Sequence, residues 1–182
     1  WAKTRAFLYG DGLFETMRIR GKKVLFWEDH AERMAQGMKI LGMEFREAEF
    51  FPKLQLGIQP LVERNPGAFH GRLRITVFRA GGGNYTPETN VPEVIIHTEP
   101  LPGDFTFQPQ SLTVFDEISL YPTPLSQVKS LNALPYVLAA RHARMRGFDD
   151  AVLLSDGYIS ETSRANIFAR FGELVVTPGL NR

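Results

Sequence analysis

Lys129-Ser130-Leu131-Asn132 is the stretch around which the chain is organised, together with Ser160-Glu161-Thr162-Ser163-Arg164-Ala165-Asn166-Ile167-Phe168 about thirty residues later. After Lys53 the only lysine is Lys129, although ten arginines follow that point. A primary amine can lose its proton and form a Schiff base with an aldehyde, whereas a guanidinium stays protonated in proteins. The count makes Lys129 a candidate reactive amine. The alternative is an exposed lysine whose isolation is due to chance.

The composition is that of a folded globular protein that binds a small molecule. The 182 residues are 43% hydrophobic and 12% aromatic, which is enough to bury a sizeable core. A formal charge of +1, dispersed along the chain, disfavours a nucleic-acid or membrane partner. Because the chain has no cysteine, disulfides, thiolate zinc sites and cysteine nucleophiles are excluded.

The apolar runs do not predict a membrane span, and the histidines do not predict a metal site. No apolar run approaches the roughly 20 residues that span a bilayer, and the N-terminus lacks a signal-peptide core, so we expect a cytoplasmic location. The four histidines are scattered without metal-ligand spacing, and no metal site is predicted. The chain starts at Trp1 rather than at a methionine, and residues 177–182 read as a turn leading into something further, which predicts a chain that is incomplete at both ends, the C-terminal one included.

The hydrophobic periodicity predicts an α+β fold in two lobes, with many short strands and three helices. The first lobe is expected to contain a hairpin of residues 13–19 and 24–27, helices over 28–41 and 52–64, and strands over 73–77 and 94–97. The second is expected to contain strands over 112–115 and 151–154, a helix over 133–146, and a hairpin of residues 167–169 and 174–176.

Leu101-Pro102-Gly103-Asp104 is the candidate domain boundary, within a linker near residues 99–110. It predicts a small N-terminal domain over residues 1–104 and the first part of a larger domain over 105–182. The run Gly81-Gly82-Gly83 with Asn84-Tyr85-Thr86-Pro87 predicts a mobile or tightly turned loop. A phosphate cradle is disfavoured because no lysine-serine pair or strong helix start follows it.

Four motifs in order resemble the signature of the class IV aminotransferases, which are pyridoxal-phosphate enzymes of fold type IV. This family includes branched-chain and D-amino-acid aminotransferases and aminodeoxychorismate lyase. The resemblance covers nearly the whole chain and implies a two-lobed fold of the D-amino-acid aminotransferase type. The motifs are Tyr9-Gly10-Asp11-Gly12-Leu13-Phe14-Glu15-Thr16, His30-Ala31-Glu32-Arg33, Lys129-Ser130-Leu131-Asn132, and Glu161 with Asn166-Ile167-Phe168.

The resemblance implies a role for each matched residue. Lys129 would bind pyridoxal 5'-phosphate as a Schiff base and move the proton at the substrate α-carbon. Glu161 would keep the cofactor's ring nitrogen protonated, Arg33 would pair with the phosphate, and Asn166 belongs to the same cofactor-binding set. Phe14, Arg74 and Tyr85 are the candidate substrate-binding residues. We expect amino-acid and 2-oxo-acid substrates, and the resemblance implies a homodimer.

Structural alternatives stand beside these roles. Arg33 could be a solvated helix residue paired with Glu32 or Asp29. Glu161 could cap a turn, and Asn166 could be a turn residue. His30 matches the family motif but is expected to be structural. Tyr85 could be an exposed loop tyrosine without a ligand.

The activity within the family stays open at this point. Branched-chain aminotransferases usually carry glycine-asparagine-tyrosine soon after the lysine, where this chain has Leu131-Asn132-Ala133. The arginine and histidine that trap the carboxylate in D-amino-acid aminotransferases are absent from residues 81–87. The loop from Phe78 to Pro87 is similar to that of the lyase, but Gly83 stands where the lyase has an arginine. Aminotransferase is the first interpretation, lyase the second, and a catalytically silent homologue the third.

Overall fold

The protein divides into two compact units, seen in a computed structural model that describes residues 3–64, 70–102 and 107–179. The first unit is Trp1–Phe105 with Val128–Leu131, and the second is Thr106–Gln127 with Asn132–Arg182. The expected boundary between residues 104 and 105 lies outside the described residues. The assignment of residues from 105 onward to a larger cofactor-binding domain stays a prediction. Residues 128–131, which carry Lys129, belong to the first unit.

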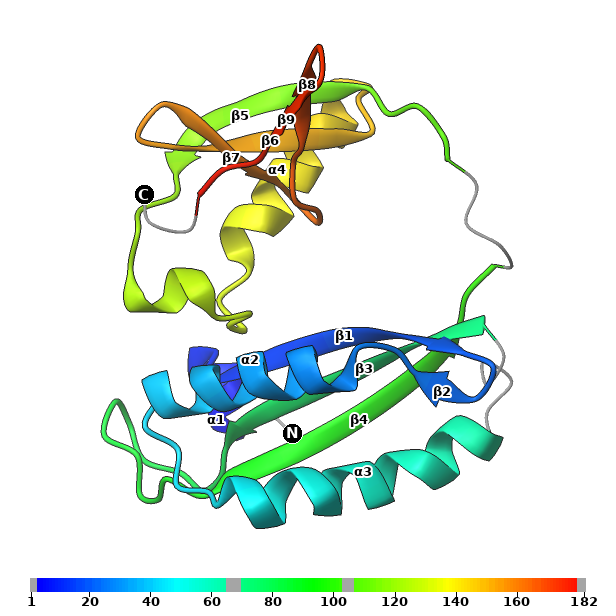
Figure 1. Cartoon of the computed structure of the whole chain (residues 1–182). Coiled ribbons are helices and arrows are strands. Elements are labelled where there is room, and N and C mark those ends of the chain that lie inside the picture. The colour runs from blue at the N-terminus through cyan, green and yellow to red at the C-terminus, as the bar shows by residue number, and fades with distance from the viewer. Residues whose placement is uncertain (1–2, 65–69, 103–106, 180–182) are drawn as a thin grey trace. The chain divides into compact units, whose positions relative to one another are not determined.

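The first unit is an antiparallel sheet with helices, in the strand order β2-β1-β3-β4 (Figure 1). Its strands alternate buried and less buried residues, as the period-two pattern predicted. Its elements are α1 (Arg5–Tyr9), β1 (Gly12–Arg20), β2 (Lys23–Val24), α2 (Trp27–Ile40), α3 (Glu47–Arg64), β3 (His70–Arg79) and β4 (Pro92–Pro100).

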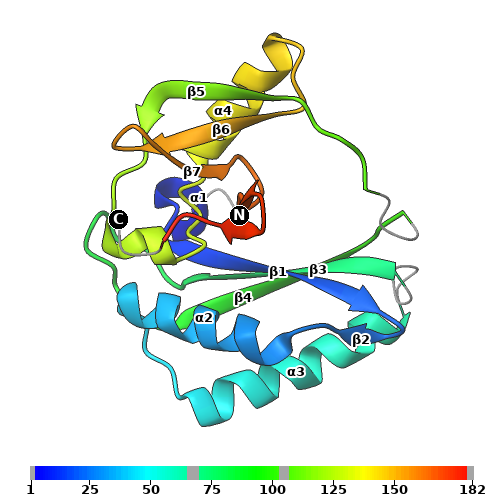
Figure 2. The same cartoon turned by 45° about the horizontal axis from the view of Figure 1, so that its top comes forward.

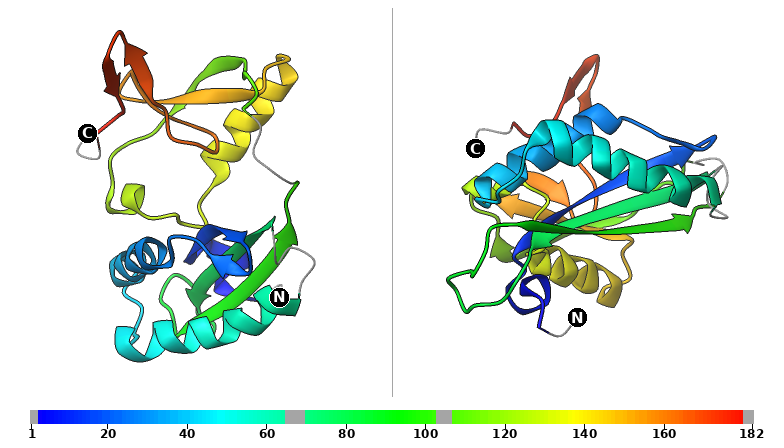
Figure 3. Two further views of the ribbon diagram at one scale, coloured as in Figure 1. Left: turned by 45° about the vertical axis from the view of Figure 1, so that its right-hand side comes forward. Right: turned by 90° about the horizontal axis from the view of Figure 1, so that it is seen from below.

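Helices α2 and α3 cover one face of this sheet (Figure 3). The odd-numbered residues of β1 and β3 point toward the helices, and the even-numbered residues point to the opposite face. Burying one apolar stripe per helix against a pleated face is the usual stable solution for such elements. The core comprises Leu13, Met17, Ile19, Met34, Met38, Met43, Leu54, Ile58, Val62, Leu73, Ile75 and Val77.

Three details of the first unit differ from the sequence prediction. Trp27 begins α2 instead of ending a strand, and α3 starts at Glu47, ahead of the predicted start at Pro52. Both Pro52 and Pro60 lie inside α3, where the apolar stripe packed against the sheet outweighs their local cost. The single turn α1, which ends at Gly10 in a left-handed conformation, had no periodic signal.

The second unit contains a three-stranded sheet in the order β5-β6-β7 and a small hairpin of β8 and β9. Helix α4 packs on β5 and β6 through Ala139 and Ala143, against Phe115, Ala151 and Leu153 (Figure 2). Its elements are β5 (Leu112–Ser119), the 3-10 turn η2 (Pro124–Gln127), α4 (Leu134–Met145), β6 (Asp150–Ser155), β7 (Tyr158–Thr162), β8 (Ala169–Phe171) and β9 (Leu174–Val176).

Strands β5 and β6 run parallel, an arrangement that the hydrophobic periodicity does not predict. A parallel pair needs a long crossover, and here it contains α4. The same crossover contains residues 128–131, which belong to the first unit. In the described part of the chain, no helix is long and apolar enough to cross a membrane.

Candidate functional site

Lys129 precedes Ser130, which forms an isolated antiparallel bridge with Leu13 of β1. The amide of Phe14 donates to the Lys129 carbonyl at 2.8 Å, and the amide of Leu131 donates to the Gly12 carbonyl at 3.0 Å. A Cβ at Gly12 would lie 2.9 Å from Leu131 Cδ1 and 2.5 Å from the Val77 carbonyl oxygen, so only glycine fits this approach. These backbone hydrogen bonds therefore fix the position of the Lys129 backbone next to β1.

The Lys129 side chain shares a face with Phe14 and Arg74, opposite the helices. Lys129 Nζ lies 5.7 Å from the centre of the Phe14 ring, and Arg74 Cζ lies 3.8 Å from it. The strand register explains the arrangement, because Phe14 pairs with Thr76 and Arg74 is two residues away on the same side of β3. Three sequence-predicted site residues therefore come together.

Both cations on this face lack an acidic partner. Among the described residues, neither Lys129 nor Arg74 forms a hydrogen bond or ion pair through its side chain. Burial lowers the pKa of Arg74 below its ordinary value, and repulsion from Arg72 lowers it further. An unpaired, half-buried guanidinium is a group that an anionic ligand would stabilise.

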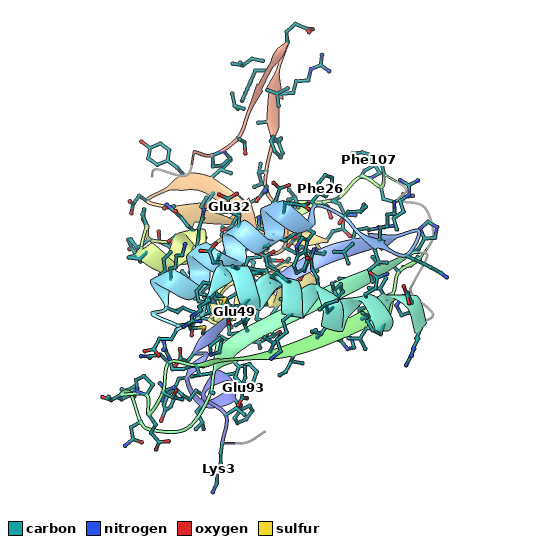
Figure 4. The ribbon with its side chains drawn as sticks, turned by 60° about the horizontal axis from the view of Figure 1, so that its bottom comes forward. Lys3, Phe26, Glu32, Glu49, Glu93 and Phe107 are labelled. Carbon is teal, nitrogen blue, oxygen red and sulfur yellow. The ribbon has the colours of Figure 1, made fainter. Side chains whose placement is uncertain are left out.

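Arg33 pairs with Glu15, a carboxylate to which the sequence motifs assign no role. Arg33 Nε donates to Glu15 Oε1 at 2.6 Å, and Nη2 donates to Oε2 at 2.6 Å. Hydrogen bonding to Glu15 raises the pKa of the Arg33 guanidinium. Glu32, one of the expected partners, is instead exposed on α2 (Figure 4). Arg33 Nη1 makes no hydrogen bond to any described residue, which leaves one edge of the guanidinium for an anion.

Glu15 is the centre of this cluster. Its side chain is 2% exposed and belongs to the helix-facing row of β1. His30 Nδ1 lies 2.7 Å from Glu15 Oε2 and donates to it when it carries the proton. A histidine three residues before Arg33 thus contacts the same carboxylate, in keeping with the structural role expected of His30.

Glu161 lies on β7 in the second unit, where it forms an isolated bridge with Asn166. The hydroxyl of Tyr136, on α4, donates to Glu161 Oε1 at 2.9 Å. Burial raises the pKa of Tyr136, and the charge of Glu161 raises it further. Tyr136 was missed in the sequence, because a tyrosine in the first turns of an apolar helix carries no signal of its own.

The glycine-rich loop is tightly turned and held by the buried side chain of Arg5. Arg5 Nη1 donates to the carbonyls of Gly82, Gly83 and Asn84 at 3.1, 3.1 and 2.7 Å. A Cβ at Gly83 would clash with the Thr86 carbonyl oxygen, and the φ of 89° at this position favours glycine. The glycine-rich loop is thus held in one conformation by hydrogen bonds from Arg5.

A second arginine supports the same arrangement. Arg5 Nε and Arg79 Nε both donate to Asp11 Oδ2, at 2.8 and 3.0 Å. Tyr85 projects from the loop with 91% of its surface exposed, and its ring centre lies 5.6 Å from that of Tyr9. No sequence signal linked Arg5 or Arg79 to the loop, since these contacts span distant parts of the chain.

Comparison with known proteins assigns the family. The family model described as "Amino-transferase class IV" matches residues 12–182. The chain belongs to the class IV aminotransferases. These are pyridoxal-phosphate-dependent enzymes, either aminotransferases or lyases. In the described residues, no group of three or more histidine, aspartate or glutamate side chains gathers to hold a metal ion.

The relatives of this chain include a lyase and an aminotransferase. The chain is 29% identical to an aminodeoxychorismate lyase of Vibrio harveyi over 97% of the chain and 65% of that protein. It is 23% identical to a D-alanine aminotransferase of Bacillus licheniformis over 95% of the chain and 60% of that protein. The chain therefore spans less than two thirds of the length of these relatives.

Crystal structures confirm the expected fold. A putative 4-amino-4-deoxychorismate lyase from Legionella pneumophila matches with a TM-score of 0.83 and 27% identity, over 98% of this chain and 65% of that one. The branched-chain amino-acid aminotransferase of Escherichia coli matches with a TM-score of 0.84 and 22% identity, over 98% and 62%. The class IV chain thus has the fold of type IV pyridoxal-phosphate enzymes.

Proposed function

We propose that the protein transfers an amino group between an amino acid and a 2-oxo acid, with Lys129 as its reactive amine and pyridoxal 5'-phosphate as its cofactor. The observation that carries the proposal is the Lys129 amine, which is anchored by backbone pairing, has no ion-pair partner among the described residues and shares a face with Arg74. An amine held in this way is available to an aldehyde.

Each of these residues has the chemistry that one part of the cofactor requires. Lys129 would hold the aldehyde carbon, Arg33 the phosphate through its open Nη1 edge, and Glu161 the ring nitrogen through Oε2. Asn166, which bridges to the backbone of Glu161, would support that strand position. The donor set includes two cations for an anionic ligand and a carboxylate for a pyridinium. When bound, the cofactor supplies an electron sink for the pair released when the substrate α-carbon loses its proton.

The remaining residues act on the substrate. Lys129 Nζ would take the proton from the α-carbon and return it to the product. Arg74 would bind a substrate carboxylate, because the pairing would compensate its unpaired, half-buried charge. Phe14 would form the pocket wall next to Lys129 and Arg74. Tyr85 would approach the substrate from the glycine-rich loop. A homodimer and a cytoplasmic location accompany this proposal.

A second candidate is aminodeoxychorismate lyase, which would release pyruvate and p-aminobenzoate. It is favoured by the Vibrio harveyi relative and by the Legionella pneumophila structure, whose identities of 29% and 27% exceed those of the aminotransferases named above. The lysine serves both reactions in the same way up to loss of the proton. The substrate pocket therefore decides between them.

Product analysis with the purified protein and pyridoxal phosphate tests both candidates. Amino donors with 2-oxoglutarate should give glutamate and a new keto acid, whereas pyruvate with p-aminobenzoate from aminodeoxychorismate would select the lyase. Lys129→Ala should abolish the visible absorbance of bound cofactor, and Lys53→Ala on α3 should retain it. A wild-type protein that stays colourless with the cofactor would contradict both candidates and favour a catalytically silent homologue.

A further inference from the structure

A tyrosine hydroxyl donates a hydrogen bond to one of the two oxygens of the Glu161 carboxylate. Tyr136 Oη donates to Glu161 Oε1 at 2.9 Å and so joins α4 to β7. Glu161 Oε2 takes no hydrogen bond from the described residues. The carboxylate is therefore fixed at one oxygen and open at the other.

Both partners of this hydrogen bond are anchored. The Tyr136 ring is half-buried and packs against the core of the second unit, which is built from Phe115, Ala139, Ala143, Ala151 and Leu153. Glu161 pairs with Leu153 in the β6–β7 ladder. The packing of the tyrosine ring and the strand pairing of Glu161 therefore restrain where the hydroxyl meets the carboxylate.

The turn that follows Glu161 is also fixed. Asp150 Oδ1 accepts from Ser163 Oγ at 2.5 Å and from the Ala151 amide at 2.8 Å. Thr162 Oγ1 accepts from the Ala165 amide at 3.1 Å. The strand pairing and the following turn thus hold the backbone of Glu161. The hydrogen bond from Tyr136 orients its carboxylate.

We propose that Tyr136 is a positioning residue that holds the Glu161 carboxylate at Oε1 and thereby directs Oε2 to the ring nitrogen of bound pyridoxal phosphate. The inference rests on the proposed function, in which Glu161 partners that nitrogen. A carboxylate restrained at one oxygen keeps its negative charge beside the nitrogen, and a nearby opposite charge favours the protonated ring. A freely rotating carboxylate would provide this stabilisation only part of the time.

The protonation state of the Tyr136 hydroxyl suits its role as a hydrogen-bond donor to Glu161. Burial, and next the adjacent carboxylate, raise the pKa of the Tyr136 hydroxyl above its ordinary value of about 10. The hydroxyl therefore keeps its proton, and remains a donor, through the neutral and mildly alkaline range. A serine or histidine in this place would lack either the reach or the fixed protonation state.

The test is a measurement of ring-nitrogen protonation in the Tyr136→Phe variant. The purified protein is loaded with pyridoxal phosphate labelled with ¹⁵N in the ring, and the nitrogen chemical shift is followed against pH. We expect the ring nitrogen to deprotonate about one pH unit lower than in the wild type, and cofactor binding to weaken about tenfold. Phenylalanine keeps the packed ring, and circular dichroism checks that the variant is folded.

Two further variants separate positioning from general damage. Tyr121→Phe, at a tyrosine of the same unit that is 66% exposed, should leave the titration unchanged. In a Glu161→Ala background, Tyr136→Phe should have no additional effect, whereas a purely structural tyrosine would weaken binding equally in both backgrounds. An unchanged titration in Tyr136→Phe, or additive losses in the double variant, would overturn the inference.

Failure of the proposed function gives a different result. If the wild-type protein does not bind the cofactor through Lys129, the ring signal titrates as that of free pyridoxal phosphate with every variant. That outcome removes the cofactor role of Glu161, and the inference with it. If the wild type binds the cofactor normally and only the Tyr136 effects are missing, the proposed function stands and Tyr136 has no positioning role.

Discussion

Arg33 and Glu15 form a two-point ion pair, with Nε and Nη2 of the arginine each 2.6 Å from a different carboxylate oxygen. The pair joins α2 to the central part of β1 and leaves Arg33 Nη1 open. One residue can thus serve the fold through two donors and a ligand through the third. Unfolding measured without cofactor reports the contribution of the ion pair to stability alone.

Arg33→Ala should lower the free energy of unfolding by about 3 kcal/mol, because it leaves the buried Glu15 carboxylate without its guanidinium partner. Arg46→Ala is the matched control, since Arg46 pairs with Glu49 at 3.0 Å on the surface, where both side chains are largely exposed. It should cost less than about 1 kcal/mol. Urea unfolding without cofactor measures both changes, and equal losses would contradict a stabilising role for the buried pair.

Arg74→Gln should raise the KM for a carboxylate substrate by about tenfold or more, because it removes a charged hydrogen-bond donor from the face of Lys129. Arg72→Gln is the control, since Arg72 is already paired with Glu99. Its KM should stay within about twofold of the wild-type value. Steady-state kinetics with the substrate found by product analysis gives the comparison, and a similar KM for both variants would argue against Arg74 as the carboxylate partner.

Arg5→Met should loosen the glycine-rich loop, since three loop carbonyls lose their shared donor. We expect faster amide hydrogen exchange over Gly82–Tyr85 and a higher KM, with a smaller change in kcat. Arg20→Met, at an exposed position at the end of β1, is the matched control. Unchanged exchange in Arg5→Met would mean that the glycine turns alone determine the loop.

Asp150 should make stability depend on acidic pH. Burial alone would raise its pKa, but hydrogen bonds from Ser163, the Ala151 amide and Thr162 outweigh it, and the pKa lies below the ordinary value. A depressed folded pKa stabilises the protein above the unfolded value of about 3.9, and this contribution is lost as pH falls through the folded pKa. Asp150→Asn should therefore flatten the decline in unfolding free energy below about pH 4. Urea unfolding from pH 3 to 6 is the measurement, and parallel curves would contradict it.

The local patterns predicted those elements whose burial alternates or repeats. The alternation in β1 and β3 and the apolar spacing of α2 and α4 were sufficient, because each buries a single face. The start of α3 was not accessible in this way. Pro52 and Pro60 are unfavourable locally, and only the packing of Leu54, Ile58 and Val62 on the sheet compensates for them.

For the candidate site, the sequence identified single residues but not their partners. The lysine count made Lys129 a candidate, and the family motif implied roles for Arg33 and Glu161. The partners Glu15, Tyr136 and Arg5 depend on contacts between elements that are distant in the chain, for which composition and spacing carry no signal. A polar residue acquires such a role only when the fold brings its partner within hydrogen-bonding distance.

The pairing of residues 129–131 with the start of β1 has a consequence for the order of folding. The second unit is interrupted in sequence by the very segment that completes the first unit's sheet edge. Closing this contact joins distant parts of the chain, and such non-local pairings form slowly because a long loop must first lose its entropy. We therefore expect the amine of Lys129 to reach its final position late, after β1 and β3 have paired and their helices are in place. A nascent or partly unfolded chain would carry the lysine but not the reactive site.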